Sequence, residues 1–181
     1  MSESGSSSSS AWWMRMLIGG NPKRTLIRIS VVVPLVLITF KWLLLPIRIQ
    51  KESMEPTYGH GRINFINRMP LFFGDPERGD IVGIRFSRNA AQGTGKVLLL
   101  KRVIGLPGET VMIRNNRLFI NELEMEEPYV KQVNQKFPWN YGPVEIEPEH
   151  YFLVGDNREM NQEDHSFGSR ERQAIIGKIL F

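Results

Sequence analysis

The sequence predicts an all-β domain of antiparallel sheets that is preceded by one N-terminal transmembrane helix. Residues 29–47 are almost wholly apolar, and a helix over this run would cross the roughly 30 Å hydrocarbon core of a membrane. Residues 62–180 hold short apolar or alternating runs between Gly, Pro, Asn and Asp residues, a pattern typical of strands and turns. Because this second region has no long amphipathic helical pattern, the fold class is all-β apart from the helix.

The length of the chain fits one domain with appendages, and its charge and residue types limit the classes of partner. The chain has 181 residues, a formal net charge of +4 and no cysteine, so it can form neither a disulfide framework nor a cysteine metal site. A basic balance suits nucleic acid or an anionic membrane surface. Because the sequence has no arginine-rich tract and no aromatic stacking pattern, we expect membrane lipid as a partner and no nucleic acid.

Residues 1–24 are expected to form a serine-rich cytoplasmic tail. Residues 1–10 are mostly serine, a composition that predicts disorder. Residues 11–18 include two tryptophans, which suit either a membrane interface or a flexible tail.

Residues 25–48 are predicted to be a transmembrane signal anchor. Pro34 is tolerable in a membrane helix, and Lys41 can extend its ammonium toward the interface. A buried helix of a soluble protein is the alternative. The many leucine and β-branched residues and the basic flanks favour a membrane span.

Basic residues predict the orientation of this anchor. Lysine and arginine favour the cytoplasmic side of a membrane, and more of them precede the apolar run than closely follow it. We therefore expect a cytoplasmic N-terminus and an extracytoplasmic β-rich domain over residues 49–181. A cleaved signal peptide is the alternative, but the run ends in Pro46-Ile47-Arg48 and lacks the small residues of a cleavage site.

The β-rich domain is predicted to contain a series of short strands. Asn115-Asn116, between two of them, is a hairpin turn signal. Glycine and proline interrupt the series at residues 74–76, 106–108 and 138–143. The expected strands cover residues 62–67, 80–86, 96–104, 110–114, 117–120, 151–154 and 174–180.

Two residues suggest a catalytic pair. Ser53 lies at the edge of a turn and Lys101 lies inside an apolar strand. A serine hydroxyl needs a base to take its proton, and burial can lower the pKa of a lysine to about 5–6 in extreme cases, which makes it a neutral base. Side chains alternate along a strand, so Lys101 would share a face with Leu99 and Val103. This stretch by itself favours a surface lysine at a strand edge.

Four short segments, taken in order, favour the interpretation of Lys101 as a buried base over that of a surface lysine. They are Ser53-Met54-Glu55-Pro56-Thr57, Arg78-Gly79-Asp80-Ile81-Val82, Lys101 through Glu109, and Gly155-Asp156-Asn157-Arg158. Together they resemble the successive sequence boxes of the type I signal peptidases, or leader peptidases. The resemblance extends over about residues 25–181, and four boxes in order are far more specific than any one of them.

The resemblance implies a β-rich peptidase domain with a serine–lysine dyad and no metal or cofactor. Ser53 would be the nucleophile, Lys101 the general base, and Met54 part of a shallow substrate pocket. The substrates would be exported preproteins with small residues at the −1 and −3 positions, and the translocation channel is a further candidate partner. The supporting residues would be Lys51, Gly155, Asp156, Asn157 and Arg158.

This chain departs from the family pattern at two positions near the site. Lys51 stands where relatives usually have a small hydroxyl residue or glycine that helps the oxyanion hole, so Lys51 either substitutes as a cationic donor or the enzyme is slow. Asp164 would raise the pKa of Lys101 if it replaced the family's lysine-supporting serine. Ser166 or His165 in a rearranged loop would be an alternative support.

Two other functions remain as alternatives. One is a catalytically weak or inactive membrane-tethered relative that binds exported peptides, which Lys51 and Asp164 would favour. The other is a self-cleaving repressor-type protease, against which the apolar run and the lack of a DNA-binding segment argue. No histidine lies in a known nucleophile motif, and His165 is the one histidine worth testing as a base because it lies close to the last of the four boxes.

The short distance in sequence between Ile47 and Ser53 would hold the nucleophile close to the membrane surface. A preprotein leaving a translocation channel presents its cleavage site at that level. Residues 69–73 and 137–139 are rich in aromatic side chains. These side chains would either contact the lipid interface or pack in the core.

Overall fold

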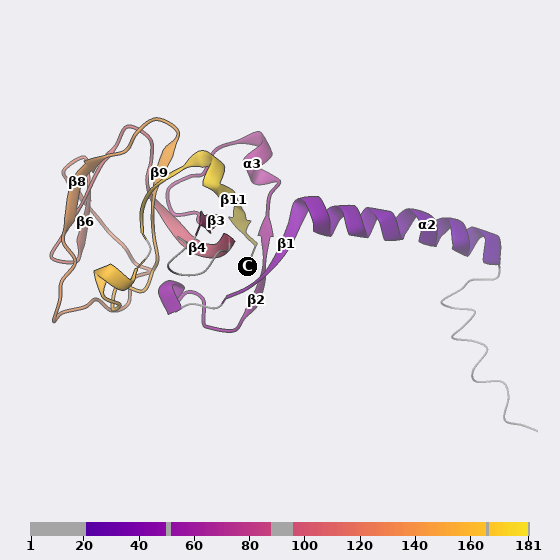
Figure 1. Ribbon diagram of the computed structural model, residues 1–181, viewed down its shortest axis with the longest axis horizontal. Helices are drawn as coiled ribbons and strands as arrows, with labels where there is room; N and C mark the ends of the chain where they lie inside the picture. The colour runs from indigo at the N-terminus through magenta and orange to yellow at the C-terminus, as the bar shows by residue number, and fades with distance from the viewer. Residues whose placement is uncertain (1–20, 50–51, 88–95, 166, 181) are drawn as a thin grey trace, which may run out of the picture. The chain divides into compact units, whose positions relative to one another are not determined.

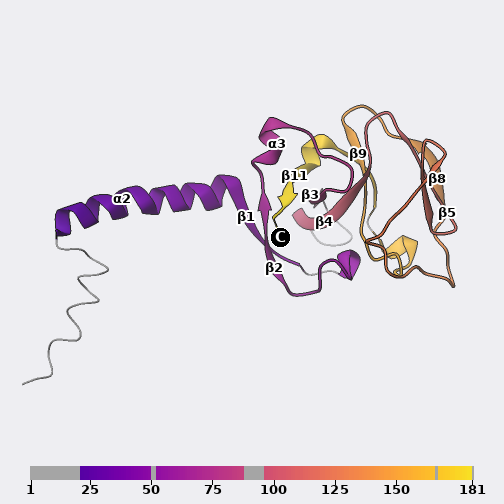
Figure 2. The same cartoon turned by 180° about the vertical axis from the view of Figure 1, so that it is seen from behind.

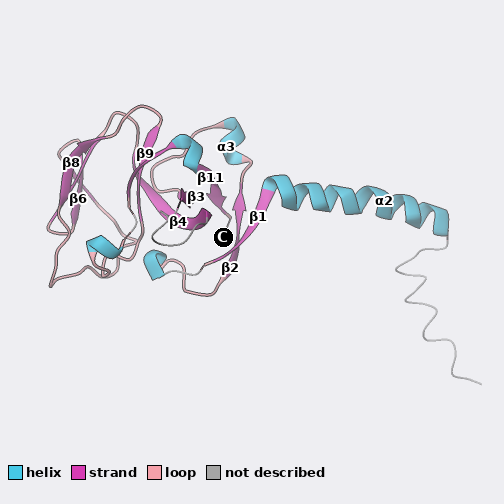
Figure 3. Cartoon of the chain, viewed as in Figure 1, coloured by secondary structure: helices cyan, strands magenta, loops and turns pink. Residues whose placement is uncertain are grey.

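The computed structural model describes residues 21–49, 52–87, 96–165 and 167–180. The chain divides into two units, one up to Trp42 and one from Leu43 onward. In the second unit the described helices are short, and most of the regular structure is antiparallel strand (Figure 3). The expected fold class, antiparallel sheets after one apolar helix, is therefore confirmed.

The described residues of the first unit form one apolar helix. Helix α2, Pro22–Ile38, continues as a π-helix, η1, over Thr39–Leu43 (Figure 1). Its two mid-helix hydroxyls bond to the helix's own carbonyls, from Ser30 to Ile27 at 2.8 Å and from Thr39 to Leu35 at 2.9 Å. Such bonds satisfy polar groups where water is absent. Among the described residues, Lys23–Leu43 is the one helix whose length and composition would let it cross a membrane.

The expected helix end at Ile47 is wrong. Leu44–Arg48 forms strand β1, which pairs antiparallel with β2, Ile63–Asn67. Pro46 explains much of this difference, because proline lacks an N–H and clashes with the preceding helical turn. β1 is an edge strand, a position where a proline leaves no ladder bond missing from the sheet interior.

A seven-stranded sheet forms the larger part of the second unit. Its order is β1-β2-β11-β3-β4-β9-β10, and every pairing in it is antiparallel. The last strand in sequence, β11, therefore lies between β2 and β3. The strands not yet given are β3 Ile81–Ser87, β4 Lys96–Gly105, β9 His150–Val154, β10 Gly168–Glu171 and β11 Ile175–Ile179.

A four-stranded sheet of order β7-β6-β5-β8 is the second layer. Its hairpin joins β5, Thr110–Arg114, to β6, Arg117–Ile120, and both strands have the predicted bounds. The turn residues Asn115 and Asn116 have φ of 49° and 65°, the left-handed values that a two-residue hairpin turn needs. On the other side β5 pairs with β8, Tyr141–Glu145 (Figure 2).

Strand β4 contributes to all three apolar clusters of the core. Ile104 packs in the cluster beside the smaller sheet, Leu99 and Val103 pack in a second cluster, and Leu100 packs in a third with Met54. Both faces of β4 are therefore buried, which explains its nearly continuous apolar sequence. A lysine in the middle of such a strand has no route to the surface along the sheet.

Several short strands were not as expected, and one aromatic residue follows only one of its two expected alternatives. β7, Leu123–Met125, and β10 were not predicted, and β8 begins inside residues 138–143, which were expected to be a break. Trp139 is a core residue with 1% of its surface exposed, so its expected alternative as a lipid contact is wrong. Short helices complete the unit: η2 Glu52–Met54, α3 Pro70–Phe73, η4 Gln162–Asp164 and η5 Arg172–Ala174.

Candidate active site

Ser53 lies in the short 3₁₀-helix η2, where neighbouring backbone groups fix it. Its side chain is buried, with 6% of the residue's surface exposed. The backbone N–H of Asn157 donates to the carbonyl of Ser53 at 3.1 Å, and the side-chain amide of Asn157 donates to the carbonyl of Glu52 at 3.0 Å. Asn157 therefore attaches the last sequence box directly to the backbone of the serine box.

Lys101 lies in β4 and is buried as expected, with 1% of its surface exposed. Its cross-strand partner on β3 is Val82. Val82, Leu99 and Val103 belong to one apolar cluster, so the predicted face for Lys101 is confirmed. The reading of Lys101 as a snorkelling surface lysine is wrong.

Gly155 is the point where the serine and lysine segments meet. β4 pairs with β9 through Arg102 and Val154, so continuing this antiparallel register by one residue puts Lys101 opposite Gly155. A Cβ at Gly155 would collide with the carbonyl oxygen of Ser53 and would lie 2.6 Å from Cε1 of His165. η2 also lies against β4, so the segments that carry Ser53 and Lys101 come together near this glycine.

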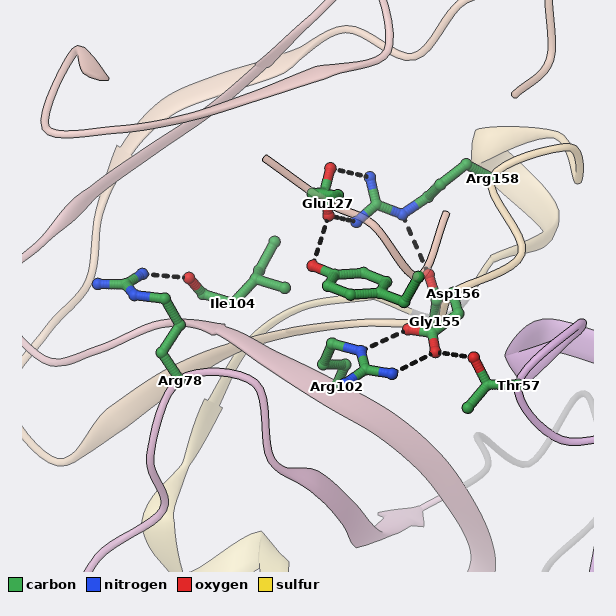
Figure 4. Close-up of polar contacts among 9 residues, drawn as sticks. Thr57, Arg78, Arg102, Ile104, Glu127, Gly155, Asp156 and Arg158 are labelled. Atoms are coloured by element: carbon green, nitrogen blue, oxygen red, sulfur yellow. Dashed lines mark hydrogen bonds and ion pairs between the residues drawn. The ribbon is translucent and has the colours of Figure 1, made fainter. Parts of the chain in front are cut away.

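Asp156 links the two segments through its carboxylate (Figure 4). Its oxygens accept from Nε and Nη2 of Arg102 at 2.8 and 2.6 Å, and one also accepts from the hydroxyl of Thr57 at 2.5 Å. Arg102 also donates to the carbonyl of Gly79 at 2.8 Å, which ties in the second sequence box. One buried carboxylate thus joins the residue after Lys101 to the turn that follows η2, the short helix that contains Ser53.

Two tyrosines and an arginine around this carboxylate have raised pKa values. Burial opposes the charge of Arg102, but its hydrogen bonds and attraction to Asp156 outweigh burial and raise the pKa of Arg102. Burial also raises the pKa of Tyr58, an effect that Arg102 partly offsets. Burial and the neighbouring Glu127 raise the pKa of Tyr129 far above its usual range. All three side chains therefore keep one protonation state near neutral pH, and the network they form is fixed.

Arg158, which was predicted as a supporting residue, forms a second buried ion pair. Its partner in that pair was not predicted. It is 1% exposed, donates from Nε to the carbonyl of Gly155 at 3.1 Å, and pairs with Glu127 (Figure 4). The hydroxyl of Tyr129 donates to the same Glu127 at 2.8 Å, and the Tyr129 ring lies 4.0 Å from the guanidinium carbon of Arg102. Glu127 and Tyr129 are supporting residues that sequence reasoning missed, because no local pattern marked them.

The other predicted site residues have mixed outcomes. Met54 is buried at 1% exposure in the third core cluster, and its substrate contact stays a prediction. Lys51 and Ser166 lie outside the described residues. Asp164 is exposed and accepts a hydrogen bond from Asn161 at 3.3 Å, whereas His165 is buried.

Ser53 and Lys101 are both buried, and the backbone carbonyl of Ser53 lies against Gly155, the residue that follows β9. The ion pairs of Arg102 with Asp156 and of Arg158 with Glu127 involve residues next to Lys101 and close to Gly155 in sequence. Among the described residues, no group of three or more His, Asp or Glu side chains is close enough to hold a metal ion.

Comparisons with known proteins identify relatives over most of the chain. The sequence model of the family described as "Signal peptidase, peptidase S26" matches residues 23–181. A signal peptidase I of Bacillus amyloliquefaciens is 36% identical over 162 residues, which is 84% of this chain and 80% of that relative. Signal peptidase I T of Bacillus subtilis is 33% identical over 162 residues, which is 84% of this chain and 80% of that relative.

A crystal structure of a signal peptidase I from Enterococcus faecalis is also similar. It is 26% identical, with a TM-score of 0.47, and the match covers 59% of this chain and 98% of that one. The family match alone spans far more than half of the sequence. This chain therefore belongs to the signal peptidase family, peptidase S26.

Proposed function

We propose that this signal peptidase removes signal peptides from exported preproteins, with Ser53 as the nucleophile and Lys101 as the general base. Its relatives are named for this activity. The single observation that supports the residue assignment is that Ser53 and Lys101 are both buried, on segments that come together near Gly155.

The proposed reaction needs only these two side chains and water. Lys101 takes the proton of the Ser53 hydroxyl as the oxygen attacks the scissile carbonyl, and then gives that proton to the departing amine. A water molecule then attacks the acyl-serine and loses a proton to Lys101; the bond between the acyl carbon and the Ser53 oxygen breaks, and Lys101 returns the proton to that oxygen. Burial supports this role, because it disfavours the charged ammonium and so favours the neutral amine.

The oxyanion formed in each step needs hydrogen-bond donors. The backbone N–H of Ser53 is the donor that we assign, since it belongs to the nucleophile itself. The removal of one oxyanion donor in other hydrolases typically costs about 10²–10³ in rate. The contribution of Lys51 stays a prediction.

The remaining residues of the last box are proposed to support the pair. Asp156 and Arg158 are both buried at 1% exposure and fully engaged in ion pairs. Neither has a free proton-transfer role in this arrangement. We therefore assign them to holding the backbone at Gly155, and Asn157 to holding Ser53.

The membrane context belongs to the same proposal. α2 is the candidate anchor, with residues 1–24 in the cytoplasm and residues 49–181 on the opposite side of the membrane. Lipid around the anchor and the translocation channel are the proposed partners. A peptidase fixed next to the exit of such a channel would meet each preprotein as it emerges.

The experiment that tests the catalytic assignment compares four full-length proteins in detergent. A labelled preprotein is incubated with the wild type and with Ser53→Ala, Lys101→Ala and Lys131→Ala, the last being an exposed lysine control. We expect cleavage after a small residue by the wild type and the control, and a loss of at least about 10³-fold in the other two. Cleavage by Ser53→Ala, or binding without turnover by the wild type, would contradict the assignment.

A further inference from the structure

We infer that His165 is a positioning residue of this peptidase, whose buried ring holds the backbone at Gly155 and Ser53 in place. The inference rests on the proposed roles of Ser53 and Lys101. It assigns to His165 a mechanical function in the reaction and no part in proton transfer.

The ring of His165 occupies the space that a side chain at position 155 would need. His165 is 3% exposed. A Cβ built on Gly155 would lie 2.6 Å from Cε1 and 2.8 Å from Nε2 of this ring, and it would also collide with the carbonyl oxygen of Ser53. The imidazole edge, the α-carbon of Gly155 and the backbone of the nucleophile therefore pack against one another.

The aromatic core holds the ring from its other side. Trp139 contacts His165 edge to face, with ring centroids 4.8 Å apart and an interplanar angle of 71°. Trp139 also stacks on Phe167 at 5.3 Å and donates from its indole nitrogen to the carbonyl of Met160 at 2.9 Å. Since Trp139 is fully buried, the ring of His165 is confined between a rigid core and the catalytic backbone.

This packing sets the position of two groups that the reaction needs. Gly155 directly follows Val154, the β9 partner of Arg102 on β4, and Asn157, two residues on, donates its backbone N–H to the carbonyl of Ser53. If the ring were removed, the turn at Gly155 would relax into the space, and the separation of hydroxyl and amine would change. A displacement of about 1 Å can cost about 100-fold in rate.

The test uses two substitutions of His165 that separate shape from acid–base chemistry. Glutamine is planar, polar and similar in length, but it does not titrate, whereas alanine leaves the space empty. In full-length protein in detergent, we expect His165→Ala to lower kcat about 10- to 100-fold with little change in KM. His165→Gln is expected to keep kcat within about threefold, and its pH–rate profile should match that of the wild type.

Two other results would overturn the inference. If His165→Gln lost as much activity as His165→Ala, or shifted the pH–rate profile, the imidazole would take part in proton transfer. If His165→Ala kept the wild-type kcat, the ring would not be needed to position the backbone at Gly155 and Ser53 for the reaction. His150→Ala is the matched control, because this histidine is only half-buried, on β9, and contacts the carbonyl of Pro148.

A second measurement keeps this test independent of the proposed catalytic pair. The amide of Asn157 donates to Ser53, so its hydrogen exchange reports the same packing without any substrate. We expect exchange to rise at least about tenfold in His165→Ala and to stay unchanged in His165→Gln. Unchanged hydrogen exchange in His165→Ala would overturn the inference. Inactivity of the wild type towards preproteins would instead refute the proposed function, and the exchange result would still test the packing.

Discussion

Gly155 and Asp156 are adjacent residues with opposite requirements. Gly155 needs the absence of a side chain, because the carbonyl of Ser53 and the ring of His165 fill the space beside its α-carbon. Asp156 needs a charged side chain, because its carboxylate is the shared acceptor for Arg102 and Thr57. Gly155 allows the backbone of Ser53 and the ring of His165 to lie close to its α-carbon. Asp156 then holds the segments of Arg102 and Thr57 together.

The substitution Gly155→Ala should therefore inactivate the enzyme. The added methyl would push η2 and the ring of His165 away from β9, and overpacking of this kind typically costs about 1–3 kcal/mol of unfolding free energy. We expect a folded protein with a lower melting temperature and a loss of preprotein cleavage of at least about 100-fold. Gly74→Ala is the matched control, because this glycine has an extended backbone and the added methyl would meet nothing closer than 4.0 Å. Cleavage at the wild-type rate by Gly155→Ala would contradict the packing described.

Asp156→Ala should cost far more stability than Thr57→Val. The first leaves Arg102, whose side chain is only 12% exposed, without its carboxylate, and a broken buried pair typically costs about 3–5 kcal/mol. The second removes one hydrogen bond, worth about 1 kcal/mol. Chemical denaturation of the two variants measures both costs, and equal losses would mean that the ion pair is not the dominant link.

The hairpin between β5 and β6 shows how one element can be predicted while its role is hidden. Asn115 and Asn116 both have left-handed φ values, as the sequence signal required. Asn116 also accepts the backbone N–H of Trp139 at 2.7 Å and donates to the carbonyl of Asn134 at 3.0 Å. The turn thus holds the loop that carries the aromatic core residue.

Replacing the two asparagines by glycine should separate turn geometry from this anchoring. Asn115→Gly keeps the backbone donor to Asn140 and should change the unfolding free energy by less than about 0.5 kcal/mol. Asn116→Gly loses both side-chain hydrogen bonds to the loop, so we expect a loss of about 1–3 kcal/mol. Thermal or chemical unfolding measures the difference, and a larger loss in Asn115→Gly would show that the turn conformation dominates.

The elements that could be predicted are those whose pattern is local. β5 and β6 have clear alternation and a turn signal, and β4 is a long apolar run. β7, β8 and β10 were missed because glycine, proline and charged residues fill them, as in Tyr141-Gly142-Pro143-Val144-Glu145. These three strands form because they pair with neighbouring strands. A local stretch of sequence does not show which strands will pair.

The candidate site likewise contains residues that a local sequence pattern marks and residues that only folding brings together. Ser53, Lys101 and the box after β9 could be found because each stands in a short pattern with a chemical meaning. Glu127 and Tyr129 could not, because their contacts to Arg158 and Arg102 join segments about 30 residues apart in sequence and only folding brings them together. The helix end was misjudged because residues 44–47 are as apolar as the helix before them.

At the scale of the whole molecule, the absence of cysteine allows a direct test of orientation. A single cysteine introduced at Ser8 or at Lys131 would be the one thiol of the chain. In intact cells, a membrane-impermeant maleimide should label Lys131→Cys and should label Ser8→Cys only after the membrane is opened. Labelling in the reverse order would overturn the proposed orientation, and preprotein cleavage by both variants controls for correct folding.

Strand β11 has a consequence for the timing of activity during synthesis. In the larger sheet, β11 joins β1 and β2, the strands on either side of Ser53 in sequence, to β3 and β4, of which β4 contains Lys101. A ribosome must therefore release residues 175–179 before the two parts of this sheet can be joined through β11. We expect a chain interrupted before Ile175 to contain Ser53 and Lys101 but to lack the strand that connects their parts of the sheet, so that folding of the domain waits until this last strand has been translated.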